Sequence, residues 1–354
     1  MRKVVIAAGG TGGHIFPGMA VGEKFAAAGF DVHWLGSEIG IEKNIVPKRF
    51  SFHTVAIYQL RGKGLKAKLF LPWRLCYATV QAMRVLRALK PAVVVSMGGF
   101  VAGPGSLAAK ILGYPLVIHE QNARAGLTNR YLSKIANVVL QAFPDSFPTH
   151  KREISVVGNP VREAILKLAE PLARLATHTG PLRILILGGS LGAQAINTLI
   201  VEWLAQCHYT NDISVRHQTG EKNFASVKAA YASGHKAVKI EAFIEDMSEA
   251  LAWADLVICR AGALTVSEVA AVGIASILIP MPQAVDNHQF YNAKYLSDHE
   301  AAILLEQKDA SAESLDRVIR KFLEHRDLIL QFSLKARELA QRDSADLILS
   351  RALA

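Results

Sequence analysis

The chain has 354 residues, of which 51% are hydrophobic and 20% charged, and its formal net charge is +10. This composition is typical of a globular protein, and the length favours two domains. Glycine, proline or charge soon interrupts each apolar run, so we expect neither a signal peptide nor a membrane-spanning helix. The three cysteines lie far apart in the sequence, which argues against a disulfide framework and fits a reducing compartment.

Short β-branched runs alternate with longer segments of mixed polarity along the chain. This alternation is typical of βαβ units, in which helices cover both faces of a parallel sheet. The first half contains predicted strands at 4–8, 32–35, 54–57, 93–97, 116–119 and 138–141. The second half contains predicted strands at 184–187, 213–218, 239–243, 256–259, 276–280 and 302–305. From about residue 312 onward the sequence predicts helix.

Each half begins with an apolar strand that leads into a glycine-rich turn and then a helix. The first turn covers 9–13, with His14 directly after it, and the second covers 188–193. We interpret the chain as two doubly wound domains in tandem, with a boundary near 158–160, where proline follows a strand. Glycine-rich turns let backbone N–H groups approach a phosphate at a helix N-terminus, but tight turning alone explains them equally well.

Neither turn matches the two common nucleotide-binding motifs. In the dinucleotide motif G-x-G-x-x-G, Ile15 would stand at the position of the third glycine, and the second turn lacks G-x-G. The Gly-Lys-Ser/Thr ending of the P-loop is also absent. The sequence therefore favours neither a nicotinamide-dependent enzyme nor a P-loop NTPase.

A one-sided basic charge marks the first half. No Asp or Glu occurs between Glu42 and Glu120, whereas Lys and Arg are frequent between 48 and 90. Such a field indicates an acidic partner, which can be a nucleic acid, an anionic membrane or a phosphorylated substrate.

Within this basic stretch, the segment 65–85 combines aromatic, aliphatic and basic residues. We interpret Lys66, Lys68, Leu69, Phe70 and Trp73 as a patch that contacts a membrane surface. The alternative is an ordinary core helix with a basic face toward solvent.

Another glycine-bearing segment, 260–268, follows the predicted strand 256–259. Its glycine should lie at a helix N-terminus, where Thr265 could donate to a phosphate and Glu268 could accept from ribose hydroxyls. The alternative is plain capping, because Thr265 and Glu268 also fit a T-x-x-E capping box. A polar cluster at 286–289 similarly fits a ligand-facing loop or a helix cap.

Proton transfer and metal binding can be judged from a few side chains. His14 can take a proton near neutral pH, although its ring could equally well only pack at the helix start. The run 119–122 resembles the beginning of the zinc motif H-E-x-x-H, but Ala123 replaces the second histidine. No Asp-x-Asp pair is present for Mg²⁺ or Mn²⁺, so a bound diphosphate would have to be stabilised by helix N-termini, hydroxyls and Arg162.

Taken together, these motifs resemble the MurG family of glycosyltransferases, and the resemblance runs almost from end to end. The matching segments are 9–18, 60–64, 97–100, 119–122, 126–129, 158–162, 188–193, 260–268 and 286–289. The resemblance implies a GT-B fold, with two Rossmann-like, doubly wound parallel-sheet domains facing across a cleft. It also implies that 1–159 faces acceptor and membrane, that 160–339 binds the donor, and that a C-terminal helix at about 340–354 packs back on the first domain.

The resemblance also implies roles for individual residues. His14 would be the general base, and Thr11, Gly12 and Gly13 would contact donor or acceptor phosphate. Arg162 and Ser190 would contact the diphosphate of the donor, and Ala263, Leu264 and Thr265 would contact its phosphate at the helix start, with Val266 and Ser267 beside them. Ile244 would contact the uracil and Glu268 the ribose. Gln289 and Asn122 would orient the N-acetylglucosamine.

The implied reaction is inverting transfer of N-acetylglucosamine from UDP-N-acetylglucosamine to the C4 hydroxyl of the muramyl sugar of lipid I. The products would be lipid II and UDP, formed for peptidoglycan without metal or other cofactor at the cytoplasmic face of the bacterial inner membrane. A GT-B enzyme with another acceptor, a nucleic-acid-binding protein and a non-catalytic sugar-nucleotide sensor are the alternatives. We expect no nucleic-acid partner, because no recognition motif accompanies the charge and an anionic membrane explains it.

Overall fold

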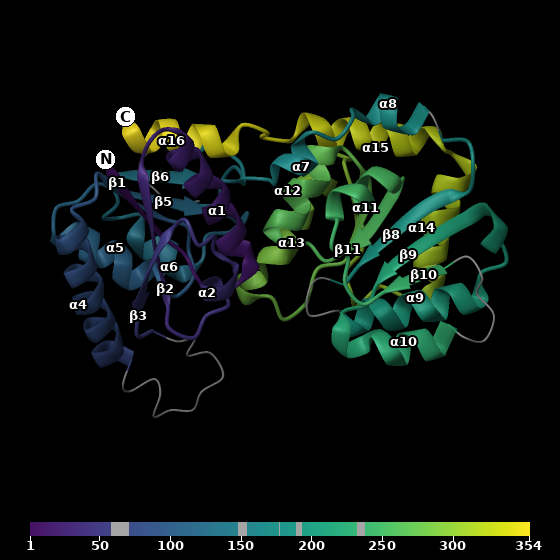
Figure 1. Cartoon of the computed structure of the whole chain (residues 1–354). Helices are drawn as coiled ribbons and strands as arrows, with labels where there is room; N and C mark the ends of the chain where they lie inside the picture. The colour runs from purple at the N-terminus through teal and green to yellow at the C-terminus, as the bar shows by residue number, and fades with distance from the viewer. Residues whose placement is uncertain (58–70, 148–153, 177, 189–192, 232–237) are drawn as a thin grey trace. The chain divides into compact units, whose positions relative to one another are not determined.

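The computed structural model describes the chain except for residues 58–70, 148–153, 177, 189–192 and 232–237. The chain divides into two compact units (Figure 1). Unit 1 comprises Met1–Val161 and Gln341–Ala354, and unit 2 comprises Arg162–Ala340. Each unit contains one parallel sheet with helices packed against it.

Unit 1 has a sheet with the order β3-β2-β1-β4-β5-β6-β7. Its strands are β1 (Lys3–Ala7), β2 (Asp31–Ser37), β3 (Ser51–Val55), β4 (Val93–Ser96), β5 (Leu116–Glu120), β6 (Val138–Gln141) and β7 (Ser155–Val156). Its helices are α1 (Gly12–Ala27), α2 (Glu42–Ile45), α4 (Leu71–Leu89), α5 (Ala102–Ile111), α6 (Leu127–Leu132) and α16 (Ser344–Leu353). The strand order reverses between β1 and β4, and ligands of open parallel sheets bind at such a switch point.

Unit 2 has a sheet with the order β10-β9-β8-β11-β12-β13, which reverses between β8 and β11. Its strands are β8 (Leu182–Leu187), β9 (Ile213–Gln218), β10 (Val238–Glu241), β11 (Leu256–Cys259), β12 (Ala275–Leu278) and β13 (Ile303–Leu304). Its α-helices are α7 (Glu163–Leu166), α8 (Pro171–Ala176), α9 (Gln194–Gln206), α10 (Phe224–Tyr231), α11 (Met247–Trp253), α12 (Ala263–Val272), α13 (His288–Ser297), α14 (Ala312–Glu324) and α15 (Asp327–Glu338). Short 3-10 turns are η1 (Thr210–Asp212), η2 (Glu221–Asn223) and η3 (Val285–Asn287).

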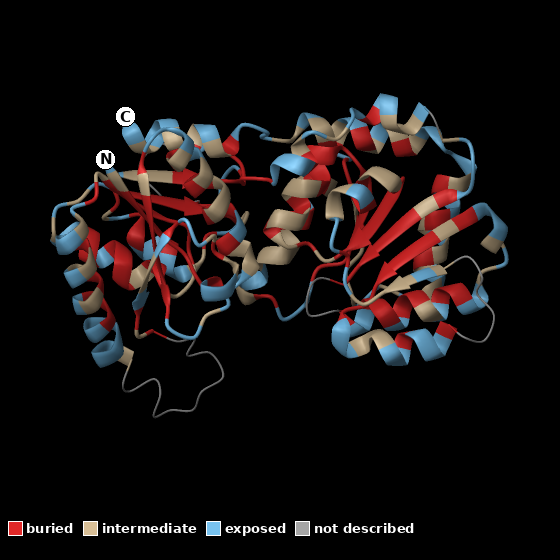
Figure 2. Ribbon diagram, in the orientation of Figure 1, coloured by how far each residue is buried: buried red, intermediate tan, exposed pale blue. Residues whose placement is uncertain are grey.

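Successive residues of the central strands pack into cores on opposite faces of the sheet. In unit 1, Val4 and Ile6 contact the core beneath α1 and α16, whereas Val5 and Ala7 contact the core beneath α4 and α5. All four are fully buried, and the central strands of both units are buried in Figure 2. Burial on both faces explains why these strands are continuous apolar runs rather than alternating ones.

The predicted strands are all present, with ends that differ by a few residues. The expected strand 239–243 is β10, which ends at Glu241, and the expected strand 54–57 is β3, which begins at Ser51. The strand expected before the boundary at 158–160 is β7, whose bounds were not predicted. The expected C-terminal helix is confirmed as three helices, α14, α15 and α16, and α16 packs on α1 with an ion pair between Lys24 and Asp346.

Across the ranges that the structure describes, no helix is both long and apolar enough to cross a bilayer. The cysteines Cys76, Cys207 and Cys259 are all free thiols.

Candidate active site

The first glycine turn lies at the switch point of unit 1, between β1 and α1. Thr11 is the N-cap of α1, so Gly12, Gly13 and His14 form its first turn. The first N–H groups of a helix have no acceptor within the helix and carry partial positive charge, which suits an anion. At Gly10, φ is +97° and a Cβ would lie 2.7 Å from the Phe100 ring, so this turn requires glycine.

The buried carboxylate of Glu42 stabilises the first glycine turn. Its side chain is fully buried, and Oε1 accepts from the backbone N–H and hydroxyl of Ser37 at 2.9 and 2.7 Å. The backbone N–H of Gly10 donates to Oε2 at 3.3 Å. Glu42 therefore connects the turn to the end of β2. Sequence reasoning missed this residue, because a lone glutamate in a short helix forms no motif.

His14 belongs to a chain of hydrogen bonds that runs into the sheet. Its Nδ1 lies 3.1 Å from Oε1 of Gln121, whose Nε2 donates to the Met97 carbonyl at 2.7 Å. The same Nε2 lies 3.1 Å from Nδ1 of His119, and Nε2 of His119 lies 2.8 Å from the carbonyl of Gly158. Burial lowers the pKa of His119 to about 4, although the bond to Gly158 opposes that shift. His119 is therefore neutral at physiological pH.

Further hydrogen bonds bring three of the predicted motif segments together. Asn159 donates from Nδ2 to the Gln121 carbonyl at 2.9 Å, so the segment 158–160 is attached to the end of β5. Glu120 is buried and accepts from both the backbone N–H and Nδ2 of Asn122, at 2.9 and 3.2 Å. Its second oxygen accepts from Nδ2 of Asn129 at 2.8 Å. Glu120 thus shapes the loop after β5, and the structure places the predicted donor residue Asn122 against it.

A cavity of about 860 Å³ opens beside Thr11 and His14. Its wall is mainly apolar and includes Leu75 of α4, Leu107 of α5 and Tyr131 of α6. This arrangement can hold an apolar group next to a polar one, because one end of the cavity carries the helix N-terminus and an imidazole.

The predicted membrane patch falls partly on α4. Lys66, Lys68, Leu69 and Phe70 lie outside the described residues. Trp73, in the first turn of the helix, is 77% exposed.

The rest of α4 combines a buried side with exposed aromatic and basic side chains. Ala82 and Leu86 pack into the core, whereas Tyr77 is 58% exposed and Arg74 is exposed. The outer side of this helix therefore offers aromatic and basic groups to a partner.

In unit 2, the helix α12 starts at the switch point beside β11. Gly262 is its N-cap, so Thr265 lies inside the first turn, and the alternative of a T-x-x-E capping box is wrong. Glu268 instead accepts at Oε1 from Nε and Nη2 of Arg162, at 3.0 and 2.8 Å. Burial raises the pKa of the Glu268 carboxyl, and the Arg162 cation opposes this rise.

Arg162 also borders a cavity of about 370 Å³ with Asp246 and Ser248. The Asp246 carboxylate accepts from the Ser248 hydroxyl at 2.5 Å and from the Glu249 backbone N–H at 3.0 Å, which lowers the pKa of Asp246. Asp246 is the N-cap of α11. Arg162 thus binds Glu268 of α12 and lines the same cavity as Asp246, the N-cap of α11.

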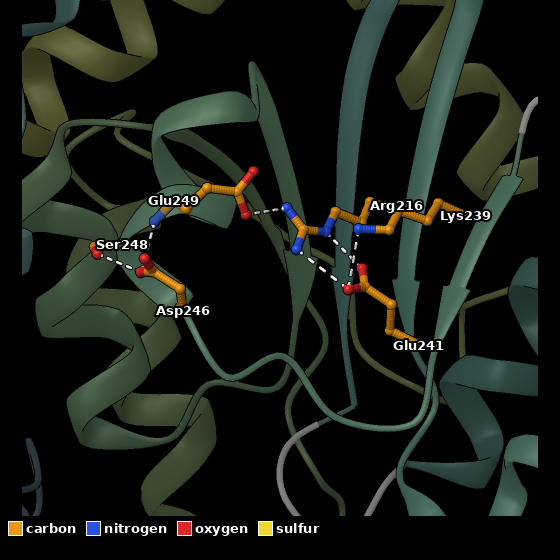
Figure 3. Close-up of polar contacts among 6 residues, drawn as sticks. All are labelled: Arg216, Lys239, Glu241, Asp246, Ser248 and Glu249. Atoms are coloured by element: carbon orange, nitrogen blue, oxygen red, sulfur yellow. Dashed lines mark hydrogen bonds and ion pairs between the residues drawn. The ribbon is translucent and has the colours of Figure 1, made fainter.

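The loop that carries Ile244 is held at both ends by one buried cation (Figure 3). Arg216 of β9 donates from Nε to Glu241 at 2.5 Å, just before the loop, and from Nη1 to Glu249 at 2.5 Å, just after it. Ile244 itself is 2% exposed. Sequence reasoning missed Arg216, since its two partners become neighbours only when the chain folds back.

Gln289 lies in the first turn of α13 and accepts at Oε1 from the Met281 backbone N–H at 3.0 Å. The two residues before α13, Asp286 and Asn287, have φ of 52° and 54°, a left-handed conformation that costs energy for residues other than glycine. Asn292 donates from Nδ2 to the carbonyl of Ala261 at 3.1 Å, which ties α13 to the start of α12.

The structure thus sorts the predicted residues into two groups. Unit 1 holds His14 and Asn122 together with Thr11, Gly12 and Gly13. Unit 2 holds the donor set, which is Arg162, Ile244, Ala263, Leu264, Thr265, Val266, Ser267, Glu268 and Gln289. Ser190 lies outside the described residues. Within the described ranges, no group of three or more His, Cys, Asp or Glu side chains is arranged to hold a metal ion.

Glycosyltransferases are among the solved structures with the same architecture. The crystal structure of Acinetobacter baumannii MurG matches with a TM-score of 0.87 at 38% identity, over 99% of both chains. CalG4, the calicheamicin glycosyltransferase, matches over the whole of both chains with a TM-score of 0.70 at 14% identity, which shows the fold alone. The expected GT-B fold, with two Rossmann-like parallel-sheet domains, is confirmed.

Sequence comparisons identify the family of the chain. Residues 4–141 match the glycosyltransferase family 28 N-terminal domain, and residues 183–352 match its C-terminal domain. Proteins of Coxiella burnetii and Tolumonas auensis are 46% and 47% identical, over 99% of this chain and 98% of theirs. Both are named UDP-N-acetylglucosamine--N-acetylmuramyl-(pentapeptide) pyrophosphoryl-undecaprenol N-acetylglucosamine transferase. The chain therefore belongs to glycosyltransferase family 28 and, within it, to the MurG family.

Proposed function

We propose that this enzyme transfers N-acetylglucosamine from UDP-N-acetylglucosamine to the C4 hydroxyl of the muramyl sugar of lipid I, with inversion at the anomeric carbon. The products are lipid II and UDP. The names of the full-length relatives support the donor and acceptor classes. The observation that carries the proposal is the position of His14, a half-buried imidazole at the edge of a mainly apolar cavity and beside a helix N-terminus.

The acceptor is assigned to unit 1. Its muramyl sugar lies beside His14, and its diphosphate is stabilised by the first N–H groups of α1, among them Gly12 and Gly13. The apolar wall of the cavity suits the lipid end of such an acceptor. His14 accepts the proton of the attacking hydroxyl as the new glycosidic bond forms.

The donor is assigned to unit 2. Its diphosphate lies at the N-terminus of α12, where Thr265 and the backbone N–H groups of Ala263 and Leu264 stabilise the charge of the leaving UDP. Arg162 and Ser190 contribute to the same diphosphate. Val266 and Ser267 complete this segment.

The rest of the donor is assigned to four side chains. Ile244 contacts the uracil, Glu268 accepts from the ribose hydroxyls, and Gln289 and Asn122 orient the N-acetylglucosamine. In the structure Glu268 forms an ion pair with Arg162, so the ribose would have to bind Glu268 beside Arg162 or displace it. No metal or other cofactor is proposed, since the leaving charge is assigned to helix N–H groups and Arg162.

The enzyme is proposed to bind the cytoplasmic face of the inner membrane peripherally. Exposed Trp73, Tyr77 and Arg74 on α4, with the basic residues before them, suit an anionic bilayer surface. Co-sedimentation with vesicles tests this, and a Trp73→Ala chain that sediments as well as the unaltered one would remove Trp73 from the patch.

A direct assay tests the reaction itself. The chain is incubated with UDP-N-acetylglucosamine and a lipid I analogue in the presence of EDTA, and both UDP and the disaccharide product are quantified. We expect product at the same rate with and without chelator, with a C4 linkage and inverted configuration by NMR. Transfer to an unrelated lipid or sugar at a higher rate than to the lipid I analogue would overturn the acceptor assignment.

A further inference from the structure

We infer that Gln121 and His119 fix the tautomer of His14, keeping its proton on Nδ1 and the lone pair on Nε2. The inference rests on the proposed function in that His14 is the base. It assigns two positioning residues, neither of which contacts the reacting atoms itself.

The orientation of the Gln121 amide is determined by its partner in the core. The Met97 carbonyl can only accept, and it lies 2.7 Å from one amide atom of Gln121. That atom must therefore be Nε2, and the other atom, 3.1 Å from Nδ1 of His14, must be Oε1. Because Oε1 can only accept, Nδ1 of His14 must carry the proton.

His119 supports the same orientation from the opposite side. The Gly158 carbonyl can only accept, so the His119 nitrogen that lies 2.8 Å from it, Nε2, carries a proton. The neutral ring then has a lone pair on Nδ1, which accepts the second proton of Gln121 Nε2 at 3.1 Å. A flipped Gln121 amide would set its oxygen against that lone pair. Neutrality follows from burial, which lowers the pKa of His119 to about 4.

Gly98 leaves the space that this contact needs. Its φ is +89°, and a Cβ there would lie 2.8 Å from Nδ1 of His14 and 3.2 Å from Oε1 of Gln121. A side chain at position 98 would therefore disturb the hydrogen bond between His14 and Gln121.

The tautomer decides whether His14 can act as a base. The acceptor oxygen forms its bond to the anomeric carbon while the bond from that carbon to the UDP oxygen breaks, and the hydroxyl proton passes to Nε2 of His14. The ring becomes a cation whose Nδ1–H still donates to Gln121. In the other tautomer Nε2 already carries a proton and cannot accept one.

Nitrogen-15 NMR of histidine-labelled protein at about pH 8 tests the inference, because the shifts of Nδ1 and Nε2 distinguish the tautomers of a neutral ring. The His14 signals are identified by their loss in His14→Ala. We expect a protonated Nδ1 and an unprotonated Nε2 for His14. A protonated Nε2 in the unaltered chain would overturn the inference even if transfer to lipid I is normal.

Two substitutions at Gln121 separate positioning from packing. Gln121→Leu removes the acceptor for Nδ1–H, and we expect kcat to fall roughly tenfold with donor KM unchanged. Gln121→Glu restores an acceptor for Nδ1–H and should recover part of kcat. A Leu variant with unchanged kcat would contradict the positioning role.

Tyr231→Phe is the matched control, since it removes a hydrogen bond from another buried histidine, His217, in unit 2. It should leave the His14 signals and kcat unchanged. Failure of the proposed function would look different, as absence of UDP release by the unaltered chain while the His14 tautomer is the expected one.

Discussion

Each unit buries a neutral histidine in its sheet, and the two histidines differ in where their hydrogen bonds lead. His119 in unit 1 and His217 in unit 2 are both fully buried, and burial lowers the pKa of each to about 4. His217 bonds to the Tyr231 hydroxyl at 2.8 Å and to Oδ1 of Asn197 at 3.0 Å. Both partners are buried, and Nδ2 of Asn197 donates to the carbonyl of the buried Thr219 at 3.0 Å, so the groups next to His217 lie within the core.

The network of His119 leads outward instead. It passes through Gln121 to His14, which is half-buried at the edge of the large cavity. Burial and a shifted pKa are therefore the same in the two units, and neither identifies a functional histidine. The difference lies in whether the network ends on a group that a ligand can reach.

The largest effect is expected where the unit 1 network ends. His14→Ala should lower kcat by about 10²–10⁴-fold, the usual contribution of a general base, with little change in donor KM. Steady-state kinetics with varied UDP-N-acetylglucosamine measure both constants. Normal turnover would remove His14 from the mechanism and would make the two networks equivalent.

A second test concerns the buried carboxylate beneath the glycine turn. Glu42→Ala leaves the donors of Ser37 and Gly10 without their acceptor, so the free energy of unfolding should fall by about 3–4 kcal/mol. Denaturant unfolding measures the change. The contact also predicts weaker activity, because the turn before α1 loses its support. A fall below about 1 kcal/mol would show that the turn does not depend on this carboxylate.

The pH dependence of stability tests what the two histidines share. Their pKa is about 4 in the folded chain and 6.5 when exposed, so between these values the unfolded chain binds more protons. The free energy of unfolding should therefore be highest above about pH 6.5 and should fall by about 3 kcal/mol per histidine as the pH drops to 4. Chemical denaturation at a series of pH values measures the slope. His217→Gln should remove only the part of this pH dependence that comes from His217. An unchanged slope in that variant would contradict the lowered pKa of His217.

A smaller effect is expected in the donor unit. Glu268→Ala removes the partner of Arg162 and the proposed ribose acceptor, so donor KM should rise about tenfold while kcat changes little. Glu249→Ala, which removes one of the two partners of Arg216, should raise donor KM less. An unchanged KM in the Glu268 variant would refute its role toward ribose.

The strands could be predicted from sequence because burial on both faces makes them continuous apolar runs. The strand expected before the boundary at 158–160 is β7, whose bounds could not be predicted because Ser155 and Val156 are too few to form a pattern. The prediction that Gly262 lies at the N-terminus of α12 is confirmed, because the backbone at Gly262 is extended and helical geometry begins after it, and only the alternative of a cap at Thr265 is wrong.

The candidate site was predictable only in part. Glycine turns and polar runs at strand ends predicted residues that the structure places where the strand order of each sheet reverses. The resemblance singled out Asn122 in the segment after β5, which stays a prediction, but it did not indicate that Gln121 lies against His14 while Asn122 lies against Glu120. Which of two neighbouring amides faces a third side chain depends on contacts distant in sequence, here Met97 and Gly158.

The comparison between the two histidine networks can be tested most directly by making the same change in each. His119→Gln and His217→Gln are compared for kcat at about pH 8, under conditions in which unfolding curves show both variants to be folded. We expect His119→Gln to lower kcat roughly tenfold, because Gln121 loses the lone pair that orients it, and His217→Gln to keep kcat within about twofold of the unaltered chain. Equal losses in the two variants, or a larger loss for His217→Gln, would contradict this expectation.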